Sequence, residues 1–297
     1  METPIVFRNQ TDLFADSREV VANNELREAL RSGDSSEAER KLGELAGLAP
    51  DHAALQPAAV IIDALRTPAP RDLSATVAYL EKLTREWTLA AETLFKAEGK
   101  ALLAPRWRAV GQALESVAFD PAQPDRHASR AYLEAGDWEA AIGAVEAEDR
   151  FAGQPVLVGR LAQALWRTQR TVQAIERWFA LCWSAPEYFT GLIGNGHISA
   201  RLLLEHWREA INADAEPEIS TVWFPAWMIL QEPGLARSVK SRGAASGPQR
   251  AFDLARKLVL ARELVMSDDE QVEARRELKD IHPGLFRRFL ENSHRLL

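Results

Sequence analysis

The sequence has little of several features that would point to a particular class of protein. It contains one cysteine, Cys182, so no disulfide can form within the chain. No apolar run approaches the roughly 20 residues that a membrane-crossing helix needs, and the N-terminal residues lack the basic and apolar regions of a secretory signal. We therefore expect a cytoplasmic protein with no membrane contact, in which Cys182 is a buried and unreactive thiol.

Catalytic and metal-binding motifs are also missing from the sequence. The six histidines are scattered, and no H-E-x-x-H motif or Cys/His cluster is present. The stretch GLIGNGH, residues 191–197, lacks the Gly-Lys-Ser/Thr ending of a phosphate-binding loop, so we interpret it as a loop between helices. The sequence GAASG, residues 243–247, does not match the nucleophile motif G-x-S-x-G. We expect no catalytic residues, no metal and no cofactor.

The charge balance of the chain argues against nucleic acid as a partner. Acidic residues number 43 and basic residues 36, which gives a net charge of -7. Such a chain has no overall field that attracts phosphates, so nucleic-acid binding would need a local basic patch. One basic cluster, made of Arg237, Lys240, Arg242 and Arg250, leaves sequence-independent nucleic-acid binding as an open alternative.

Hydrophobic residues recur with the period of a helix, and strand-like alternation is almost absent. In TVQAIERWFALCW, the residues Ile175, Trp178, Phe179 and Cys182 fall at i, i+3, i+4 and i+7, which places them on one helical face. Similar stripes occur within residues 38–46, 200–211 and 251–259. The pattern predicts an all-α protein.

The helical segments also repeat. In AYLEAGDWEAAIGAVEAE, residues 131–148, a Gly-Asp turn at Gly136 separates two helical segments, and a similar turn begins at Gly33. Small residues, Ala141 and Ala38, follow each glycine by five positions, where they allow two helices to approach closely. From Ala141 to the equivalent Ala174 the shift is 174 − 141 = 33 residues.

This pattern resembles the tetratricopeptide repeat, a helix-turn-helix unit of about 34 residues. The matching positions are Gly33, Ala38 and Pro50, then Tyr132, Gly136 and Ala141, then Ala162, Leu165, Ala174, Trp178 and Pro186. The resemblance covers residues 18–210 and departs from the family at Gln169 and Arg170, where Gly-Asp is expected. It implies an α-solenoid of antiparallel helical hairpins.

The C-terminal part of the chain is expected to differ from the repeats. We predict a repeat region over residues 1–235, a flexible basic linker over 236–249, and a C-terminal helical cap over 250–297. Ser267 and Glu270 form a capping box that starts a helix, and Pro283 suits the first turn of another. We expect a loop over NADAEPEIS, residues 212–220, and an interruption at Pro225 in TVWFPAWMIL.

The resemblance implies a protein-interaction scaffold that binds a peptide or protein segment in the concave groove of the repeat array. The expected groove-lining residues are Arg27, Arg31, Arg126, Arg130, Gln163, Arg167, His197 and Arg201. The guanidinium groups of the arginines suit the carboxylates of an acidic or C-terminal peptide, although Glu134 breaks the pattern. The alternative is that they are ordinary solvated arginines.

A second candidate contact surface is the irregular stretch that holds Trp223 and Trp227. The alternative for both tryptophans is packing in a domain core, where buried aromatic residues are common. A different class of function also stays open at this stage. The repeats could support an enzyme or a regulatory domain whose site lies near residues 191–230.

Overall fold

A computed structural model describes residues 17–70, 72–195, 201–212, 221–240 and 246–296. All regular secondary structure within these ranges is helical, and none of it is strand, so the all-α prediction is confirmed. The chain divides into two compact units, Met1–Asp137 and Trp138–Leu297, which are described separately below. No helix in the described ranges combines the length and the apolar character that a membrane crossing requires.

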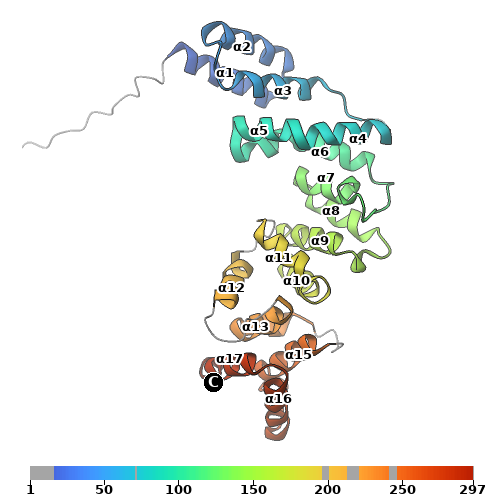
Figure 1. The fold of residues 1–297 in the computed structure, drawn as a ribbon, viewed down its shortest axis with the longest axis vertical. Coiled ribbons are helices and arrows are strands. Elements are labelled where there is room, and N and C mark those ends of the chain that lie inside the picture. Colours follow the sequence, from blue (N-terminus) through green and yellow to red (C-terminus); the bar gives the residue numbers. More distant parts are fainter. Residues whose placement is uncertain (1–16, 71, 196–200, 213–220, 241–245, 297) are drawn as a thin grey trace, which may run out of the picture. The chain divides into compact units, whose positions relative to one another are not determined.

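Unit 1 is built from helices that pack against their neighbours in the chain (Figure 1). Its elements are α1 (Arg18–Ser32), α2 (Ser35–Leu48), α3 (Leu55–Arg66), α4 (Leu73–Lys82), the π-helical turn η1 (Leu83–Trp87), α5 (Thr88–Phe95), η2 (Lys96–Glu98), α6 (Gly99–Ala113), η3 (Pro124–Arg126) and α7 (Ala128–Ala135). In sequence, α1 packs on α2, α2 on α3, α3 on α5, α5 on α6, and α6 on α7. The core of this unit is therefore made by local pairs of helices.

The first helical pair shows how the sequence sets these boundaries. The Ser17 side chain accepts a hydrogen bond from the Val20 N–H and caps the start of α1. Gly33 ends this helix with φ of 76°, a left-handed conformation that suits glycine. The Asp34 side chain then accepts hydrogen bonds from the Ser36 and Glu37 N–H groups and caps α2. The turn predicted at Gly33 is thus present.

Close approach between helices depends on a glycine at the start of α6. A Cβ added at Gly99 would lie 2.6 Å from both the carbonyl carbon and the carbonyl oxygen of Ala91 in α5. Real Cβ atoms are not found at that separation, and the atoms they would meet belong to a helix backbone. Only glycine fits here without moving α5 relative to α6.

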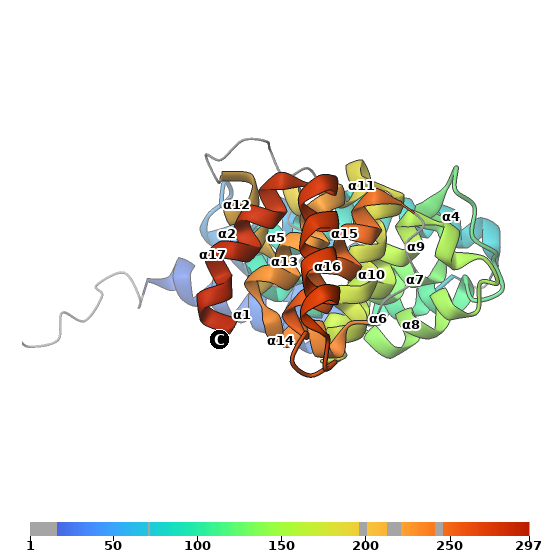
Figure 2. The same cartoon turned by 90° about the horizontal axis from the view of Figure 1, so that it is seen from below.

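Unit 2 continues the same packing of neighbouring helices. Its elements are α8 (Trp138–Glu146), η4 (Phe151–Gly153), α9 (Pro155–Arg167), α10 (Thr171–Ser184), α11 (Pro186–Gly194), α12 (Arg201–Asn212), η5 (Thr221–Trp223), α13 (Phe224–Gln231), α14 (Pro233–Ser238), α15 (Gly247–Val259), α16 (Asp268–Ile281) and α17 (Pro283–Leu296). At its C-terminal end, α15 packs on α13 and α16, and α17 packs on α16 and α13 (Figure 2).

Several residues singled out in the sequence are buried in unit 2. Ala141 and Ala174 are 1% and 0% exposed, as expected of small residues where helices touch. Cys182 is fully buried, and this burial raises the pKa of its thiol well above the ordinary value. Gln169 replaces the expected turn glycine and takes up the left-handed conformation itself, with φ of 62°. The turn geometry is therefore retained although the residue type is not.

The predicted features of the C-terminal region have mixed outcomes. The capping box of Ser267 and Glu270 is present, and Pro283 is the first residue of α17, so both predictions are confirmed. The predicted interruption at Pro225 is wrong. Helix α13 begins one residue earlier, at Phe224, so Pro225 lies in its first turn. Backbone N–H groups there have no partner within the helix, so a proline costs no helical hydrogen bond.

Two expected loops and the expected linker are helical in part. Residues 191–194 of the predicted loop belong to the last turn of α11, and residues 196 and 197 lie outside the described residues. The predicted linker overlaps the end of α14 and the start of α15, while its residues 241–245 are likewise outside the described part. The loop expected over 212–220 includes Asn212, the last residue of α12, and its remaining positions are not described. The boundaries at 235 and 250 stay predictions.

Candidate functional site

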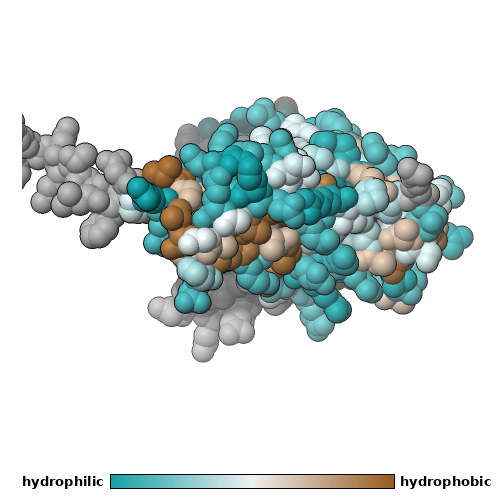
Figure 3. Space-filling model, turned by 90° about the horizontal axis from the view of Figure 1, so that it is seen from above, coloured by the Kyte–Doolittle hydropathy of each residue, from teal (hydrophilic) through white to brown (hydrophobic). Residues whose placement is uncertain are grey.

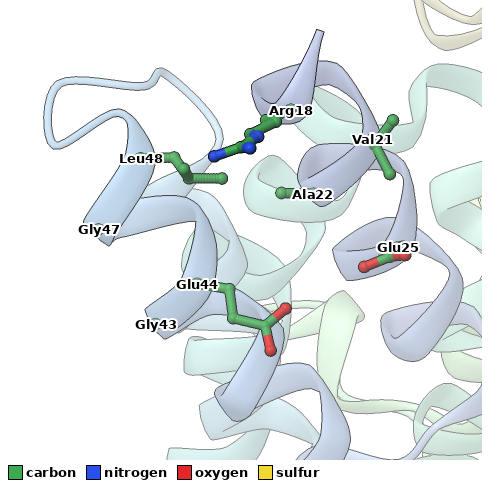
Figure 4. A pocket seen from close by; sticks show the side chains of 8 residues that line it. All are labelled: Arg18, Val21, Ala22, Glu25, Gly43, Glu44, Gly47 and Leu48. Carbon is green, nitrogen blue, oxygen red and sulfur yellow. The ribbon is translucent and has the colours of Figure 1, made fainter. Parts of the chain in front are cut away.

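A groove runs along the surface of unit 1 between α1 and α2, with a volume of about 530 Å³ (Figure 4). The residues that line it are Arg18, Val21, Ala22 and Glu25 from α1 and Gly43, Glu44, Gly47 and Leu48 from α2. Those of α1 follow the i, i+3, i+4, i+7 spacing of a single helical face. This face borders the one that carries Leu26 and Leu30 into the core, and the two faces share Ala22.

The walls of the groove are apolar and open to solvent. Val21 is 43% exposed and Leu48 is 49% exposed, and both are among the large hydrophobic side chains that the described part of the chain leaves uncovered. Ala22, only 5% exposed, lies between them. Seen from above, this end of unit 1 has apolar side chains bordered by hydrophilic ones (Figure 3). Apolar surface with a polar border is typical of a binding site.

The α2 side of the groove contains two exposed glycines inside the helix. Gly43 and Gly47 are one turn apart in α2, and no heavy atom of another described residue lies within 4 Å of where their Cβ atoms would stand. A glycine in a helix interior costs about 1 kcal/mol relative to alanine. Neither glycine has a left-handed φ, and neither allows a close contact within the described chain, unlike Gly99. Residues that lower helix stability without a structural reason are found mainly at functional sites.

The two ends of the groove carry opposite charges. Arg18 and Leu48 lie at one end, and Glu25 and Glu44 lie at the other (Figure 4). No residue in the described ranges forms an ion pair with Arg18. Lys41 donates hydrogen bonds to Glu25 and, at 3.1 Å, to Glu44, and these bonds raise the pKa of its ammonium group.

Both carboxylates remain accessible although they share Lys41 and Glu44 also accepts a hydrogen bond from Arg40. The Glu25 side chain is 48% exposed and that of Glu44 is 43% exposed, whereas that of Lys41 is only 15% exposed. The groove can therefore offer a cation at one end, an apolar centre, and carboxylate oxygens at the other end.

The structure places the sequence-predicted arginines of unit 1 among acidic neighbours. Arg31 lies 3.1 Å from Glu98 and stacks over the ring of Phe95 at 5.2 Å. Arg130 binds Asp125 at 2.7 Å and lies 3.3 Å from Glu134. Arg27 is half-buried on α1, and Arg126 is an exposed residue of η3. The two arginines with ion pairs offer less positive charge than the sequence pattern implied.

The remaining predicted groove residues belong to unit 2. Gln163 is half-buried in α9, and the Arg167 guanidinium at the end of that helix stacks over Trp138 at 5.4 Å. His197 lies outside the described residues. Arg201 begins α12, and its side chain is not described. Whether these residues line one surface with those of unit 1 stays a prediction.

Of the two tryptophans predicted as candidate contacts, Trp227 belongs to the interior of unit 2 and Trp223 is half-buried. Trp227 is 2% exposed and packs against Phe224, with ring centroids 6.2 Å apart. Trp223 is half-buried, with its ring 4.7 Å from that of His282. The expected exposure of Trp227 is corrected by its burial, because α13 packs against α10, α15 and α17. The core-packing alternative holds for this residue.

In the described part of the region around residues 191–230, His206 lies between two carboxylates, with Nδ1 3.1 Å from Glu209 and Nε2 2.9 Å from Glu232. Phe224 and the six residues that follow it in α13 are buried, and all seven have apolar or aromatic side chains without acid or base chemistry. Across the described residues, no three His, Cys, Asp or Glu side chains come together in a way that could hold a metal ion.

Sequence reasoning missed the α1–α2 groove, although it left a signal. The stretch GELAG, residues 43–47, places glycines at i and i+4 in an otherwise helical segment. This spacing puts both on one helical face, where helices can approach each other closely. The exposed positions of Val21 and Leu48 beside that face could not be read from the sequence.

Comparisons with known proteins do not add to this picture. The chain has no match among protein-family models, among curated proteins or among solved structures. We therefore infer function from the geometry of the site.

Proposed function

We propose that this protein is an interaction module that binds a short apolar segment of another protein in the α1–α2 groove. The observation that carries the proposal is an open groove with two half-exposed apolar walls, Val21 and Leu48, over the unfilled glycines Gly43 and Gly47. Helix-in-groove recognition is a recurring mode of peptide binding, and small residues in the groove let the peptide backbone come close.

The charges of the groove indicate which peptides fit. An acidic side chain or a terminal carboxylate would lie beside Arg18, since a guanidinium group can bind a carboxylate through two hydrogen bonds. A basic side chain would lie beside Glu25 and Glu44. The acidic or C-terminal partner expected from the sequence thus remains part of the proposal, with Arg18 as the residue that receives the carboxylate.

The repeat resemblance of residues 18–210 supports the same class of function by analogy. An array of repeat hairpins, as we propose for this chain, would present α1 and α2 as its first pair. The end of such an array has one helix face without a repeat to cover it. A groove on the first pair is then a natural place for a partner.

The test is a selection of random phage-displayed peptides on the full chain. We expect enrichment of peptides with two or three apolar residues and an acidic residue on one side. Gly43→Trp fills the groove and should weaken their binding more than about 30-fold, a loss of about 2 kcal/mol. The matched control is Gly143→Trp, at an exposed glycine of α8 whose Cβ would also meet no atom within 4 Å.

The result that contradicts the proposal is equally clear. If the selected peptides bind Gly43→Trp as tightly as the unchanged chain, the binding surface lies elsewhere. The paired arginines of the predicted trough, Arg130 and Arg167, would then be the next positions to change.

A further inference from the structure

A histidine in unit 2 forms a charged cluster that the α1–α2 groove does not include. His206 of α12 donates or accepts at both ring nitrogens, with Nδ1 3.1 Å from Glu209 of its own helix and Nε2 2.9 Å from Glu232, which follows α13. The imidazole is only 12% exposed, whereas the two carboxylate side chains are 59% and 41% exposed. Its ring also packs on that of Trp227, with centroids 5.8 Å apart. His206 therefore links α12 to the end of α13.

The number of hydrogen bonds that this histidine can donate depends on its protonation. A neutral imidazole has one N–H donor and one acceptor nitrogen, whereas an imidazolium donates from both nitrogens. An ionised carboxylate only accepts hydrogen bonds. Both bonds of His206 can therefore form together only when the ring is charged. Loss of the proton leaves a nitrogen lone pair facing a carboxylate oxygen.

Two further charged residues of α12 lie on other sides of the helix. Glu205 and Arg208 are exposed and stand one and two positions from His206, where side chains do not face each other. At three or four positions, where residues share a face, Glu209 is the only charged residue. Helix α13, on which α12 packs, contains no charged residue.

The charged residues of other helices near this cluster have ion-pair partners. Arg288 of α17 lies 5.8 Å from the centre of the Trp227 ring, and its guanidinium is 3.0 Å from Glu291. In α14, Arg237 donates a hydrogen bond of 2.7 Å to Glu263. The two carboxylates at the imidazole are therefore the charges that act on it most directly.

The helix that this histidine holds covers aromatic residues of the core. Trp207, 5% exposed, packs edge-to-face with Phe189 of α11 and Phe224 of α13, with ring centroids 5.5 and 5.0 Å apart. Leu203 and Ala210 of the same helix are 1% and 2% exposed. Movement of α12 away from α13 would uncover both phenylalanines.

We propose that the charge of His206 sets how firmly α12 is held on α13. When the ring is protonated, both carboxylates bind it and α12 covers Phe189 and Phe224. When the ring is neutral, one of the two bonds is lost and α12 opens more often. Docking is therefore strongest at acidic pH and weakens as the pH rises through the range in which histidine loses its proton, about pH 5 to 8. This switch does not depend on peptide binding in the α1–α2 groove.

Thiol labelling of the full chain measures the opening of α12. Ala210→Cys places a thiol at a buried position, which a small neutral reagent reaches only when the helix moves away. Ser184→Cys, a conservative change at an exposed position of α10, is the matched control for the effect of pH on the thiol itself. The ratio of the first labelling rate to the second should rise about tenfold from pH 6 to pH 8, equivalent to about 1.4 kcal/mol. Peptide mapping separates both positions from native Cys182.

Two variants distinguish protonation from packing. His206→Gln has a neutral side chain at every pH, so the labelling ratio should be high and equal at pH 6 and pH 8. Glu232→Gln should give a ratio that is low and equal at both, because its amide can donate to a neutral ring as well as accept from it. A role in packing alone would leave the pH dependence unchanged in Glu232→Gln.

Two results overturn the inference. One is a ratio that does not change between pH 6 and pH 8 with His206 in place, and the other is a rise that persists in His206→Gln. Buried Cys182 reports general unfolding, and if His206→Gln unfolds the chain, an unchanged rise in Glu232→Gln overturns the inference instead. His282 cannot produce the expected rise. Burial lowers the pKa of His282, so its protonation would destabilise the fold on acidification and not as the pH rises.

Discussion

Replacing Gly43 by alanine tests the groove sharply because the fold and the proposed function respond to it in opposite directions. Gly43 is an exposed residue in the interior of α2, and its added methyl group would meet no heavy atom within 4 Å. The free energy of unfolding should therefore rise by about 1 kcal/mol, the difference in helix propensity between glycine and alanine. For a unit of this size the melting temperature would rise by about 4 °C.

The same methyl group should weaken peptide binding. It stands on the α2 side of the groove, where a bound segment would contact the helix backbone. Overpacking of a close contact costs on the order of 1 kcal/mol, so we expect about a fivefold loss of affinity. A variant that is more stable and binds less well cannot be explained by damage to the fold.

Two matched glycines serve as controls. Gly143→Ala, in the interior of α8 and equally open, should raise stability by about 1 kcal/mol without changing peptide affinity. Gly99→Ala should lower stability by about 2 kcal/mol, since its methyl group would collide with the backbone of Ala91. Urea denaturation followed by circular dichroism measures the first effect, and calorimetric titration with a selected peptide measures the second.

Two results would refute this reasoning. A loss of stability in Gly43→Ala would mean that the position is covered in solution. A loss of affinity in Gly143→Ala equal to that in Gly43→Ala would mean that the peptide does not recognise the groove.

The remaining predictions concern the conformation or the protonation of single residues. Gln169→Gly should raise the free energy of unfolding by about 1 kcal/mol, because it relieves a left-handed backbone at φ of 62°; an unchanged urea midpoint would contradict this. Burial lowers the pKa of His282 in the folded chain, so the unfolded chain binds a proton at this residue first as the pH falls. The contribution of neutral His282 to stability is therefore present above a pH of about 6.5 and is lost as the pH falls through the lowered pKa of the folded chain. His282→Asn, which keeps an acceptor for the Leu285 N–H, should flatten this part of a pH series of urea midpoints, and an unaltered series would argue against the assignment. Buried Cys182, with its raised pKa, should react with a thiol reagent only after unfolding, and prompt labelling of the native protein would show that it is accessible.

Local chemistry made much of the fold predictable from the sequence. The period of Ile175, Trp178, Phe179 and Cys182 places four buried residues on one face of α10, and all four are at most 1% exposed. Helix ends could also be predicted from the sequence, because a capping box such as Ser267 with Glu270 involves only residues three positions apart. These features depend on contacts within a few residues, which the order of amino acids determines directly.

Contacts between distant residues could not be derived in the same way. Arg31 looked like a basic side chain available to a partner, but Glu98, 67 positions away, lies 3.1 Å from it. Trp227 looked like a candidate for exposure, but α10, α15 and α17 pack against its helix. Which acid meets which base, and which ring is covered, depends on helices that are far apart in the chain.

The groove shows most clearly which features the sequence determines and which only the tertiary structure determines. The sequence by itself determined that α1 and α2 are amphipathic helices joined at Gly33, and that glycines stand one turn apart at 43 and 47. The hydrophobic periodicity of a helix face is the same whether other parts of the chain cover that face or a binding partner does. Only the packing of unit 1 decided that Leu26 and Leu30 are buried while Val21 and Leu48 stay open, because burial is a property of the neighbours that surround a side chain.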